Sequence, residues 1–581
     1  MSKPKSSIQE ISSHNDSESI SRFSRSGIQG GKLNLLENYG GLGWRFFERL
    51  KLDSDKIFQV DVNRSFTETK GSVRRRSIQL AMGLRAHGVI EYDIIVICSK
   101  NNADQVIVLL ATLFLGAIVA PLDPEFTRNE KEHLLKKLRP KICFGDTRSV
   151  PILETTIRIL NLDTEVVNFS EESCGDIPFI KLFSPKEDES FQPPFVQDTG
   201  KTVAFILPTQ GTTGVPKLVC LSHDNICLQC SICETILDLP NRVISFFPLS
   251  WILQTILICV CLKSSITLII PGVFSTKAAC KLIKNFEIGY AVLGTDFAMK
   301  LANSVAVKVD IPPLAYEQFI LLMLMFISKN TDIKCLKCVV VGIVNTSKYD
   351  IRTLRSTLPG VKFLSIYCMV EAGCIAATKL KDYTLSMVKP SDFIGRLTYN
   401  CKVKIVDIRD GELCGPNTYG EVYFYGDGLM LGYFKDKEGT LSTIDKGYFK
   451  TGDMGKYDED GWLSVPGRLE DLIRFDTWSM VPTDLEDIIV CHEHVKDAAV
   501  IGDNDYLIAV VQKTSDSQLV APEVYSYITR QLHRKYWPNQ VILLEHFPRT
   551  TVGAVRKNVL RKAYLYRTIM CSSSFALERE K

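Results

Sequence analysis

The most informative stretch of this chain lies at residues 209–217. It reads Thr209-Gln210-Gly211-Thr212-Thr213-Gly214-Val215-Pro216-Lys217. Glycines free the backbone for positive φ and close approach, so backbone N–H groups and threonine hydroxyls can surround phosphate oxygens. The spacing is not that of a P-loop, which needs four residues between its glycines and a Gly-Lys-Ser/Thr end. Taken alone, the stretch is equally typical of a surface turn rich in Gly, Thr and Pro.

The chain around this loop alternates apolar strands with helices. A buried strand is predicted at 203–207, directly before the loop. Residues 94–98 and 118–122 are further strand candidates with a helix predicted between them at 103–116. This rhythm indicates βαβ units and a mostly parallel sheet. Such sheets bind ligands beyond the carboxyl ends of their strands, where we expect the loop and residues 367–371 to lie.

The pattern of apolar and polar residues changes after about residue 400. Residues 402–406 and 421–425 alternate like strands of a small antiparallel barrel. Beyond Arg468 an α+β segment follows, with helices predicted at 482–491 and 522–535. We therefore predict an α/β fold. It has a large N-terminal domain of parallel α/β sheets plus a small distorted β-barrel, and a small mobile α+β C-terminal domain.

The length of 581 residues exceeds what one hydrophobic core usually supports, so two or more domains are expected. We place a disordered Ser-rich tail at 1–31, the N-terminal domain at 32–467, the C-terminal domain at 468–566 and a second tail at 567–581. The net charge of +3 gives no reason to propose nucleic acid as a partner. No apolar run reaches the ~20 residues of a spanning helix, and we expect a cytoplasmic protein with room for peripheral membrane contact.

Eighteen cysteines in a chain without a secretory signal indicate a reducing compartment rather than a disulfide framework. Cys227, Cys230 and Cys233 lie on one predicted helix, and Cys335 and Cys338 begin an apolar strand. Neither group has the second half that a structural zinc site needs, so we interpret both as packing.

Four further motifs follow the loop along the chain. They are Tyr367-Cys368-Met369-Val370-Glu371, Tyr448-Phe449-Lys450-Thr451-Gly452-Asp453, Gly467-Arg468-Leu469-Glu470-Asp471 and Pro548-Arg549-Thr550-Thr551-Val552-Gly553-Ala554. In this order and spacing the five motifs resemble the adenylate-forming superfamily of acyl-CoA synthetases, 4-coumarate–CoA ligases and insect luciferases. The resemblance runs from about residue 45 to about residue 565.

The resemblance implies attack of a carboxylate on the α-phosphate of ATP, followed by displacement of AMP by a thiol, usually coenzyme A. It implies a nucleotide site at Thr209, Gln210, Gly211, Thr212, Thr213, Gly214, Lys217, Gly342, Tyr367, Cys368, Met369, Val370, Asp453 and Arg468. The catalytic positions it implies are Thr212, Thr213 and Lys217 at the leaving phosphates and Glu371 at Mg²⁺. Tyr367 matches the aromatic that stacks on adenine, and Asp453 and Arg468 match the ribose-binding pair.

Ser250 and Trp251 resemble the segment whose aromatic gates the acyl pocket, the alternative being that Trp251 is only core. Glu470 matches the hinge position about which the second domain rotates in the family. Thr477 replaces a glycine in the loop that approaches coenzyme A in the family, Gln210 replaces a serine, and Val370 replaces a threonine near the α-phosphate.

The family's C-terminal lysine, which bridges the substrate carboxylate and the α-phosphate, is absent. Ala554 occupies its position, and a methyl group supplies neither charge nor hydrogen bond. Arg556 and Lys557 are the weak substitute candidates, because two or three residues of extended chain shift a head group by roughly 7–10 Å.

Two hypotheses follow from these matches and departures. The first is an acid–thiol ligase that activates a fatty or other apolar acid with ATP, Mg²⁺ and coenzyme A, with adenylation impaired. The second is a non-catalytic pseudoenzyme that binds nucleotide or acyl-CoA. A peroxisomal location is left open by the family, although Glu580 and Lys581 form no Ser-Lys-Leu type address. The acid and any protein partner stay unassigned.

Overall fold

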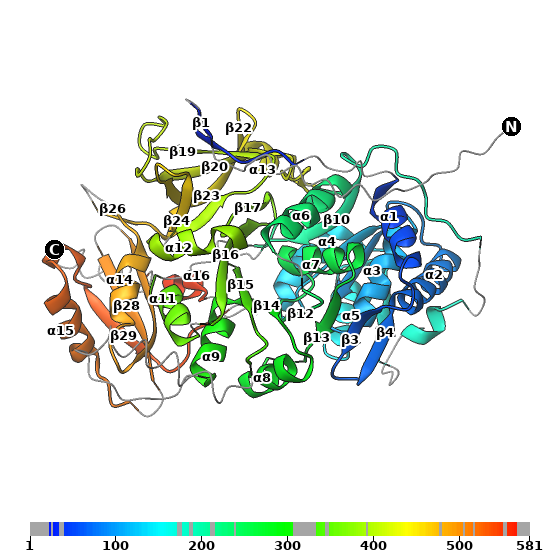
Figure 1. Cartoon of the computed structure of the whole chain (residues 1–581), viewed down its shortest axis with the longest axis horizontal. Helices are drawn as coiled ribbons and strands as arrows, with labels where there is room; N and C mark the ends of the chain where they lie inside the picture. The colour runs from blue at the N-terminus through cyan, green and yellow to red at the C-terminus, as the bar shows by residue number, and fades with distance from the viewer. Residues whose placement is uncertain are drawn as a thin grey trace, which may run out of the picture.

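The fold is that of a computed structural model, which describes most of the chain. The described residues are 22–24, 27–33, 40–170, 177–184, 190–209, 215–237, 240–272, 274–305, 333–342, 348–358, 360–390, 393–475, 479–503, 506–514, 517–549 and 555–565. Two large sheets with helices between and outside them form the N-terminal domain, and a small α+β domain follows (Figure 1).

The first large sheet has eight strands in the order β21-β11-β10-β6-β5-β7-β8-β9. Their bounds are β5 (Ile94–Cys98), β6 (Ile118–Pro121), β7 (Ile142–Gly145), β8 (Glu165–Asn168), β9 (Ile177–Pro178), β10 (Val203–Pro208), β11 (Leu218–Ser222) and β21 (Gly432–Tyr433). Strands β10, β6, β5, β7, β8 and β9 run parallel, as the alternation with helices predicts. The loop that follows β10 leads into the antiparallel strand β11, so it closes a hairpin rather than a strand–helix turn.

The second sheet has sixteen strands in the order β1-β2-β19-β20-β23-β24-β18-β17-β16-β15-β14-β12-β13-β3-β4, with β22 beside β23. Its parallel part comprises β3 (Ile57–Asp61), β12 (Arg242–Ser245), β13 (Thr267–Ile270), β14 (Tyr290–Gly294), β15 (Cys338–Gly342) and β16 (Lys362–Met369), with β4 (Phe66–Thr69) antiparallel at its edge. Its antiparallel part comprises β1 (Arg22–Ser24), β2 (Gly27–Gln29), β17 (Gly373–Ala377), β18 (Phe393–Leu397), β19 (Cys401–Val406), β20 (Gly420–Gly426), β22 (Ile444–Asp445), β23 (Tyr448–Tyr457) and β24 (Trp462–Arg468). The predicted barrel strands therefore continue the second sheet.

Helices fill three layers around these sheets. Those in contact with the central core are α1 (Gly41–Lys51), α2 (Lys70–Ala86), α3 (Asp104–Phe114), α6 (His223–Ile236) and α7 (Ile252–Lys263). Two others cover the outer face of the eight-stranded sheet, α4 (Arg128–Leu138) and α5 (Val150–Ile159). Three cover the outer face of the other sheet, α8 (Thr276–Asn285), α9 (Thr295–Val305) and α11 (Lys348–Thr357). The short helices α12 (Tyr383–Val388) and α13 (Lys437–Ser442) lie in connections. Burial of both sheet faces explains why the parallel strands read as continuous apolar runs.

The C-terminal domain packs helices on both faces of a small sheet. The domain has a three-stranded sheet of β27 (Val495–Asp503), β28 (Tyr506–Lys513) and β29 (Gln540–Leu544), and a separate two-stranded sheet of β25 (Ile473–Arg474) and β26 (Ser479–Met480). Its helices are α14 (Pro482–Ile489), α15 (Ala521–Gln531) and α16 (Lys557–Leu560). Two apolar clusters, one on each face of β27–β28–β29, give it a core of its own. The predicted fold class is thus confirmed.

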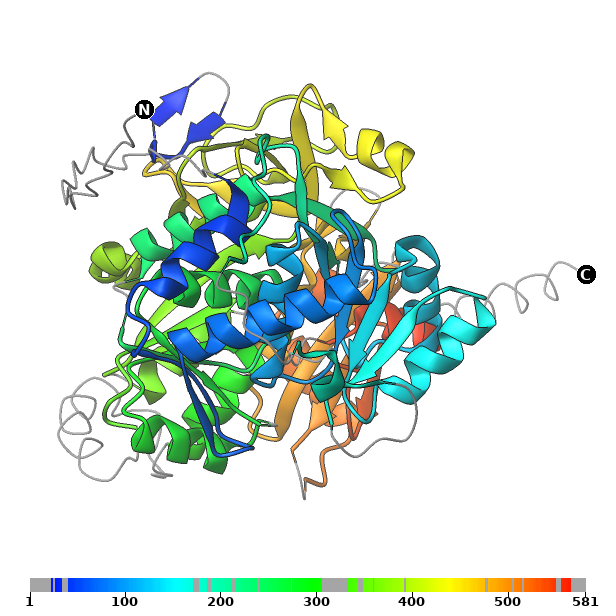
Figure 2. The same ribbon diagram turned by 90° about the vertical axis from the view of Figure 1, so that its right-hand side faces the viewer.

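The prediction that residues 1–31 are disordered is wrong for residues 22–24 and 27–31, which include strands β1 and β2. Strand β2 pairs antiparallel with β19, and Gly30 N–H donates to Cys401 O at 2.9 Å. Gly27 has φ +117°, and a Cβ there would lie 2.3 Å from the Val403 carbonyl oxygen, so only glycine fits. An exposed sheet edge offers unpaired backbone groups, which a polar segment can satisfy without large apolar side chains. Figure 2 shows these dark blue strands beside the yellow strands of the barrel part.

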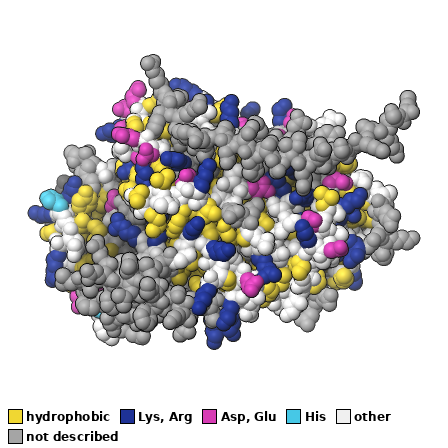
Figure 3. Space-filling view, viewed as in Figure 1, with side chains coloured by type: hydrophobic (Ala, Val, Ile, Leu, Met, Phe, Trp, Pro, Cys, Tyr) yellow, Lys and Arg dark blue, Asp and Glu magenta, His cyan; other side chains and the backbone are white. Residues whose placement is uncertain are grey.

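The described residues bear on the predictions for the cysteines and for membrane-spanning helices. Every cysteine that the structure describes is a free thiol, and Cys227 and Cys230 are buried in the central core. No helix within the described ranges is both long and apolar enough to cross a bilayer. Cationic and anionic side chains are interspersed over the face seen in Figure 3.

Candidate active site

Three predicted nucleotide-site residues meet in a buried network, which we call the Asp453 network. Strands β23 and β24 place Asp453 opposite Arg468, and Arg468 Nε lies 3.0 Å from Asp453 Oδ1. Tyr367, near the end of β16, donates its hydroxyl to Asp453 Oδ2. Both Asp453 and Tyr367 are buried. Each carboxylate oxygen of Asp453 has one partner, Arg468 at Oδ1 and Tyr367 at Oδ2.

The charges of this network oppose the cost of burial. Burial raises the pKa of Asp453, while the Arg468 charge and the Tyr367 hydrogen bond lower it. The Asp453 carboxylate in turn raises the pKa of Arg468, which stays a cation. Arg468 Nη1 also donates to Thr451 O at 3.0 Å, and Thr451 Oγ1 accepts from the Asp453 N–H at 3.1 Å. The result is a rigid acceptor that could receive hydroxyl donors from a ribose.

Glu371 lies in the turn between β16 and β17 and is buried. Its Oε1 accepts a hydrogen bond from the Tyr433 hydroxyl at 3.1 Å. Burial raises the pKa of Glu371, while that hydrogen bond and the Arg468 charge lower it. A single buried carboxylate whose oxygens have further lone pairs to offer fits Mg²⁺, which commonly binds one or two carboxylates together with substrate phosphates. The donor chemistry of Glu371 therefore fits the predicted metal role.

The ends of the predicted phosphate loop are clamped together. Thr209 N–H donates to Lys217 O at 2.8 Å, and Lys217 N–H donates to Thr209 Oγ1 at 2.9 Å. Lys217 Nζ lies 4.5 Å from the centroid of the Tyr433 ring. Gln210, Gly211, Thr212, Thr213 and Gly214 fall outside the described residues, and their roles stay predictions.

The predicted adenine side is formed at the ends of two neighbouring parallel strands. Gly342 ends β15 beside Ile366 of β16, and a Cβ on Gly342 would lie 2.9 Å from Leu253 Cδ1. Met369, the last residue of β16, and Val370, in the turn that follows, are buried, and Cys368 is half-buried. Gln229, which the motifs did not indicate, holds this turn because its Oε1 accepts from Cys374 N at 2.8 Å. Buried Val370 supplies no hydrogen-bond donor there.

Ser250 and Trp251 lie directly before α7, and both are buried. Trp251 stacks on Phe247 with ring centroids 5.2 Å apart. Ser250 Oγ, Trp251 Nε1 and Gln254 Oε1 have no hydrogen-bond partner among the described residues. Buried polar atoms are normally paired, so three orphans within five residues mark a place where a polar ligand group could bind.

An apolar cavity of about 30 Å³ lies behind this turn. It is lined by Gln229, Ile232, Cys233, Ile236, Leu237, Leu253, Ile256, Leu257, Val292, Val340, Ile366 and Cys374. Its lining comes from α6, α7 and the parallel strands of the second sheet. The volume equals that of about one water molecule. An acyl chain would therefore enter only if side chains on these elements move apart.

A larger cleft of about 1000 Å³ lies between the two domains. Arg549 and Arg556 line it from the C-terminal domain, and Lys100, Phe246 and Pro248 line it from the N-terminal domain. Arg556 therefore faces the segment that precedes Trp251. Ala554 lies outside the described residues.

Lys557 points away from this cleft into the C-terminal domain. Its Nζ lies 2.7 Å from Glu486 Oε1, and both side chains are about nine-tenths buried. Glu486 Oε1 also accepts from Val500 N–H at 2.6 Å. This pairing disfavours Lys557 as the substitute for the absent lysine, because freeing it would leave a buried carboxylate unpaired.

The geometry above can be compared with known protein families. The model of the AMP-binding enzyme family matches residues 46–434, and that of the AMP-binding enzyme C-terminal domain matches residues 484–554. The chain belongs to the AMP-binding enzyme family. The predicted membership of the adenylate-forming superfamily, which includes acyl-CoA ligases, is thereby confirmed.

Plant ligases and several solved structures are similar to this AMP-binding protein over most of its length. A 4-coumarate–CoA ligase of Vanilla planifolia is 26% identical over 514 residues, covering 85% of this chain and 88% of that protein. 4-Coumarate–CoA ligase 3 of Arabidopsis thaliana is 26% identical over 532 residues, covering 89% of this chain and 90% of that protein. ATP-bound MatB from Rhodopseudomonas palustris shares the fold with a TM-score of 0.76 at 22% identity, covering 90% of this chain and 99% of that chain. The luciferase-like enzyme from the nonluminescent mealworm Zophobas morio gives a TM-score of 0.67 at 24% identity, covering 76% of this chain and 98% of that chain.

The predicted hinge of this AMP-binding protein follows β24. Glu470 is exposed in a short 3₁₀ turn, Leu469–Asp471, that joins the domains. Asp471, the next residue, accepts from Arg561 Nη1 at 2.7 Å. This ion pair ties the C-terminal end of the small domain to the connection. Rotation about Glu470 stays a prediction, and Thr477 lies outside the described residues.

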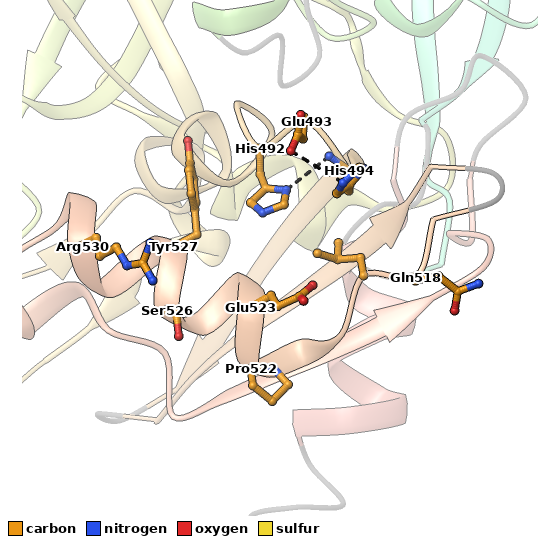
Figure 4. A pocket seen from close by; sticks show the side chains of 10 residues that line it. His492, Glu493, His494, Gln518, Pro522, Glu523, Ser526, Tyr527 and Arg530 are labelled. Carbon is orange, nitrogen blue, oxygen red and sulfur yellow. Dashed lines mark hydrogen bonds and ion pairs between the residues drawn. The ribbon is translucent and has the colours of Figure 1, made fainter.

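A separate hollow of about 550 Å³ lies on the C-terminal domain, between the turn at His492–His494 and α15 (Figure 4). His492 Nδ1 accepts from His494 N–H at 3.2 Å, and the His492 ring meets Tyr527 edge-on. Within the described ranges, no three His, Cys, Asp or Glu side chains are placed to hold a metal ion. None of the predicted site residues lines this hollow.

Proposed function

We propose that this protein is an acid–thiol ligase that activates an apolar carboxylic acid with ATP and transfers the acyl group to coenzyme A, with an impaired adenylation step. The observation that carries this proposal is the buried Asp453 network beside Glu371. Burying a charge is costly unless the charge is paired. Carboxylates with perturbed pKa values that converge in one place are typical of functional sites. The names of the plant relatives support the same class of reaction.

In the first proposed step, a carboxylate oxygen of the acid attacks the α-phosphorus of ATP and the bond to pyrophosphate breaks. In the second, the thiol sulfur attacks the acyl carbonyl carbon and AMP leaves. Negative charge gathers at phosphorus in the first step, so cations and hydrogen-bond donors there stabilise the transition state. Lys217 would attract the leaving phosphates, and the Asp453 network would hold the ribose. Mg²⁺, when held by Glu371 and phosphate oxygens, would neutralise part of the charge.

The apolar side chains around the small cavity favour an acid with a fatty or otherwise apolar tail, which would enter once these side chains move apart. Gln229 is the polar side chain of its lining, and the Gln229 Oε1 atom is already engaged by Cys374 N–H. Apart from Gln229 and the two cysteines, the lining side chains offer a tail hydroxyl no hydrogen-bond partner, and an unpaired buried hydroxyl costs about 1–3 kcal/mol. We therefore infer that an acid with a hydrocarbon tail is preferred over one whose tail carries a hydroxyl group.

The alternative, a non-catalytic nucleotide or acyl-CoA binder, is favoured by the C-terminal segment. Ala554 supplies no charge, and Lys557 is committed to Glu486. Arg556 is the remaining nearby cation and lines the interdomain cleft, whose lining does not include Tyr367, Glu371 or Asp453.

ATP–pyrophosphate exchange over a panel of fatty and aromatic acids tests the proposal. We expect weak exchange in the natural protein and a rise of about 10²–10³-fold in Ala554→Lys, the range that one transition-state donor contributes in other enzymes. Ala554→Met is the matched control, since it adds the side-chain length without the charge. Equal exchange in the Lys and Met variants would refute the missing-charge explanation. Robust exchange in the natural protein would remove the pseudoenzyme alternative.

Thermal stabilisation by ATP with Mg²⁺ tests the nucleotide site without requiring turnover. Binding at 100 times the dissociation constant stabilises the folded state by about 2.7 kcal/mol. An unchanged melting temperature at millimolar ATP would count against both the ligase and the nucleotide-binding pseudoenzyme.

A further inference from the structure

Tyr433 is a buried tyrosine that contacts two of the predicted catalytic residues at once. Its hydroxyl donates to Glu371 Oε1 at 3.1 Å, and its ring centroid lies 4.5 Å from Lys217 Nζ. Only 7% of its surface is exposed. One side chain thus joins the carboxylate predicted for the metal to the ammonium predicted for the leaving phosphates.

The backbone around Tyr433 is fixed from two sides. In the pairing of β21 with β11, Tyr433 stands opposite Val219, two residues after Lys217. Leu431 N–H donates to Cys220 O at 2.9 Å and Phe434 N–H donates to Leu218 O at 2.7 Å. Tyr433 N–H donates to Thr440 Oγ1 at 2.9 Å. The ring therefore has a defined position relative to the end of the phosphate loop.

The same segment also holds the backbone of Glu371. Met430 N–H donates to Glu371 O at 2.8 Å. Residues 430–434 consequently contact both the turn after β16 in the sixteen-stranded sheet and β11 in the eight-stranded sheet. The two predicted catalytic residues come from different sheets, and Tyr433 is a direct side-chain link between them.

The type of contact matters for Lys217. Within the described part of the chain, no carboxylate forms an ion pair with its ammonium group. An aromatic face attracts a cation without cancelling its charge, whereas a carboxylate partner would neutralise it. The ring therefore restrains Lys217 while leaving its positive charge for an anionic ligand.

We propose that Tyr433 is a positioning residue of the triphosphate site: its hydroxyl orients Glu371 for a divalent cation, and its ring orients Lys217 for the β- and γ-phosphates. This inference rests on the proposed nucleotide site. It assigns to Tyr433 two separable functions, one sensitive to the metal and the other to the phosphates. AMP, which lacks both terminal phosphates, senses neither.

Calorimetric titration of the full-length protein separates these functions. ATP with Mg²⁺, ATP with EDTA, and AMP with EDTA are the three probes. Tyr433→Phe keeps the ring and removes the hydroxyl. We expect it to weaken ATP binding about 3–10-fold with Mg²⁺, the effect of one hydrogen bond to a charged group, and to leave the other two affinities unchanged.

Tyr433→Leu removes the ring as well. We expect a further loss of about 3–10-fold in ATP affinity, with or without Mg²⁺, and unchanged AMP affinity. In a Glu371→Gln background, Tyr433→Phe should add less than about twofold, because its effect passes through that carboxylate. Tyr457→Phe is the matched control: Tyr457 is a similarly buried tyrosine at the end of β23 in the sixteen-stranded sheet, and its hydroxyl donates to Cys414 O at 3.3 Å. We expect no change in any affinity.

A purely structural role for Tyr433 would weaken ATP and AMP together, and that result would overturn the proposal. Unchanged ATP binding in Tyr433→Leu would overturn it as well. Both results leave the proposed function standing, because the natural protein still binds nucleotide. If the natural protein binds neither ATP nor AMP, the proposed function fails, and the role of Tyr433 fails with it.

Discussion

The Asp453 network and the segment after Pro548 use their charged side chains in opposite ways. In the network, Tyr367 and Arg468 converge on one buried carboxylate that faces the ends of the central strands. In the C-terminal segment, Lys557 pairs with Glu486 inside its own domain, and Arg561 pairs with Asp471. The first region concentrates charge where a nucleotide is predicted to bind. In the second region, Lys557 is the lysine nearest to Ala554 in sequence, and it stabilises the small domain through its ion pair with Glu486.

This difference indicates that binding and chemistry have separate requirements here. The predicted nucleotide side keeps its buried carboxylates and their partners, an arrangement typical of functional sites. The C-terminal segment has Ala554 where the resemblance predicts a lysine, and it holds the next lysine, Lys557, in a buried pair. A protein with this division is expected to bind nucleotide well and to form adenylate slowly.

The largest expected effect concerns the ion pair between Lys557 and Glu486 in the C-terminal domain. Lys557→Met leaves the buried Glu486 carboxylate without its cation, and we expect the small domain to lose about 3–5 kcal/mol of stability. Arg556→Met, one residue away, removes a side chain that lines the interdomain cleft and should leave stability unchanged. Scanning calorimetry of both variants measures this. Equal melting temperatures would show that Lys557 is free to act elsewhere.

The next effect concerns the nucleotide side. Asp453→Asn removes the negative charge that binds both Arg468 and Tyr367. We expect the free energy of AMP binding to weaken by about 2–3 kcal/mol, or roughly 30–150-fold in affinity. Titration calorimetry gives this number. Asp407→Asn is the control, because Asp407 pairs with Arg409 at 2.7 Å on the surface. Similar losses in the two variants would mean that the network has no special role in nucleotide binding.

A pH effect is expected at His223, which begins α6 beside the central core. Its Nδ1 accepts from Leu42 N–H at 3.1 Å, and burial lowers its pKa from 6.5 to about 4, with Asp224 opposing the shift. Between these values the unfolded chain binds a proton that the folded protein excludes, so stability falls as the pH drops through this window. From about pH 7 to pH 5 the loss is about 2 kcal/mol.

His223→Asn keeps an acceptor for Leu42 N–H and removes the titration. Urea unfolding of both proteins at several pH values should show a flatter profile for the variant between pH 4 and 6.5. Parallel profiles would show that the pKa of His223 hardly changes on folding, and they would contradict the lowered value.

The smallest expected effect concerns the orphan atoms at the start of α7. Trp251→Phe removes an indole N–H that has no partner among the described residues, so stability should change by less than about 1 kcal/mol. If that N–H serves the acid, competition between acids for adenylate formation in the Ala554→Lys protein should shift by up to about tenfold. Unchanged stability with unchanged acid selectivity would restrict Trp251 to a core role.

Local sequence determined much of this protein. The alternation of apolar runs and helices predicted the parallel sheets, since burial on both faces requires continuous apolar strands. Five motifs in a fixed order indicated the family. Ala554, at the position where the motifs predict a lysine, could be read directly, because residue type is a property of the sequence alone. The order of the chain could not show that the N-terminal residues 27–31 add a strand to a distant edge.

Only the tertiary structure decided which charges are available. Lys557 and Arg556 are adjacent in sequence, yet the first is buried against Glu486 and the second lines a cleft. Tyr433 has no signal of its own, because its two partners are 62 and 216 positions away along the chain. Charge pairing and burial depend on distances in space, and side chains far apart in sequence meet only where strand pairing brings them together. That is the physical reason why the family was readable from the sequence and the coupling within its site was not.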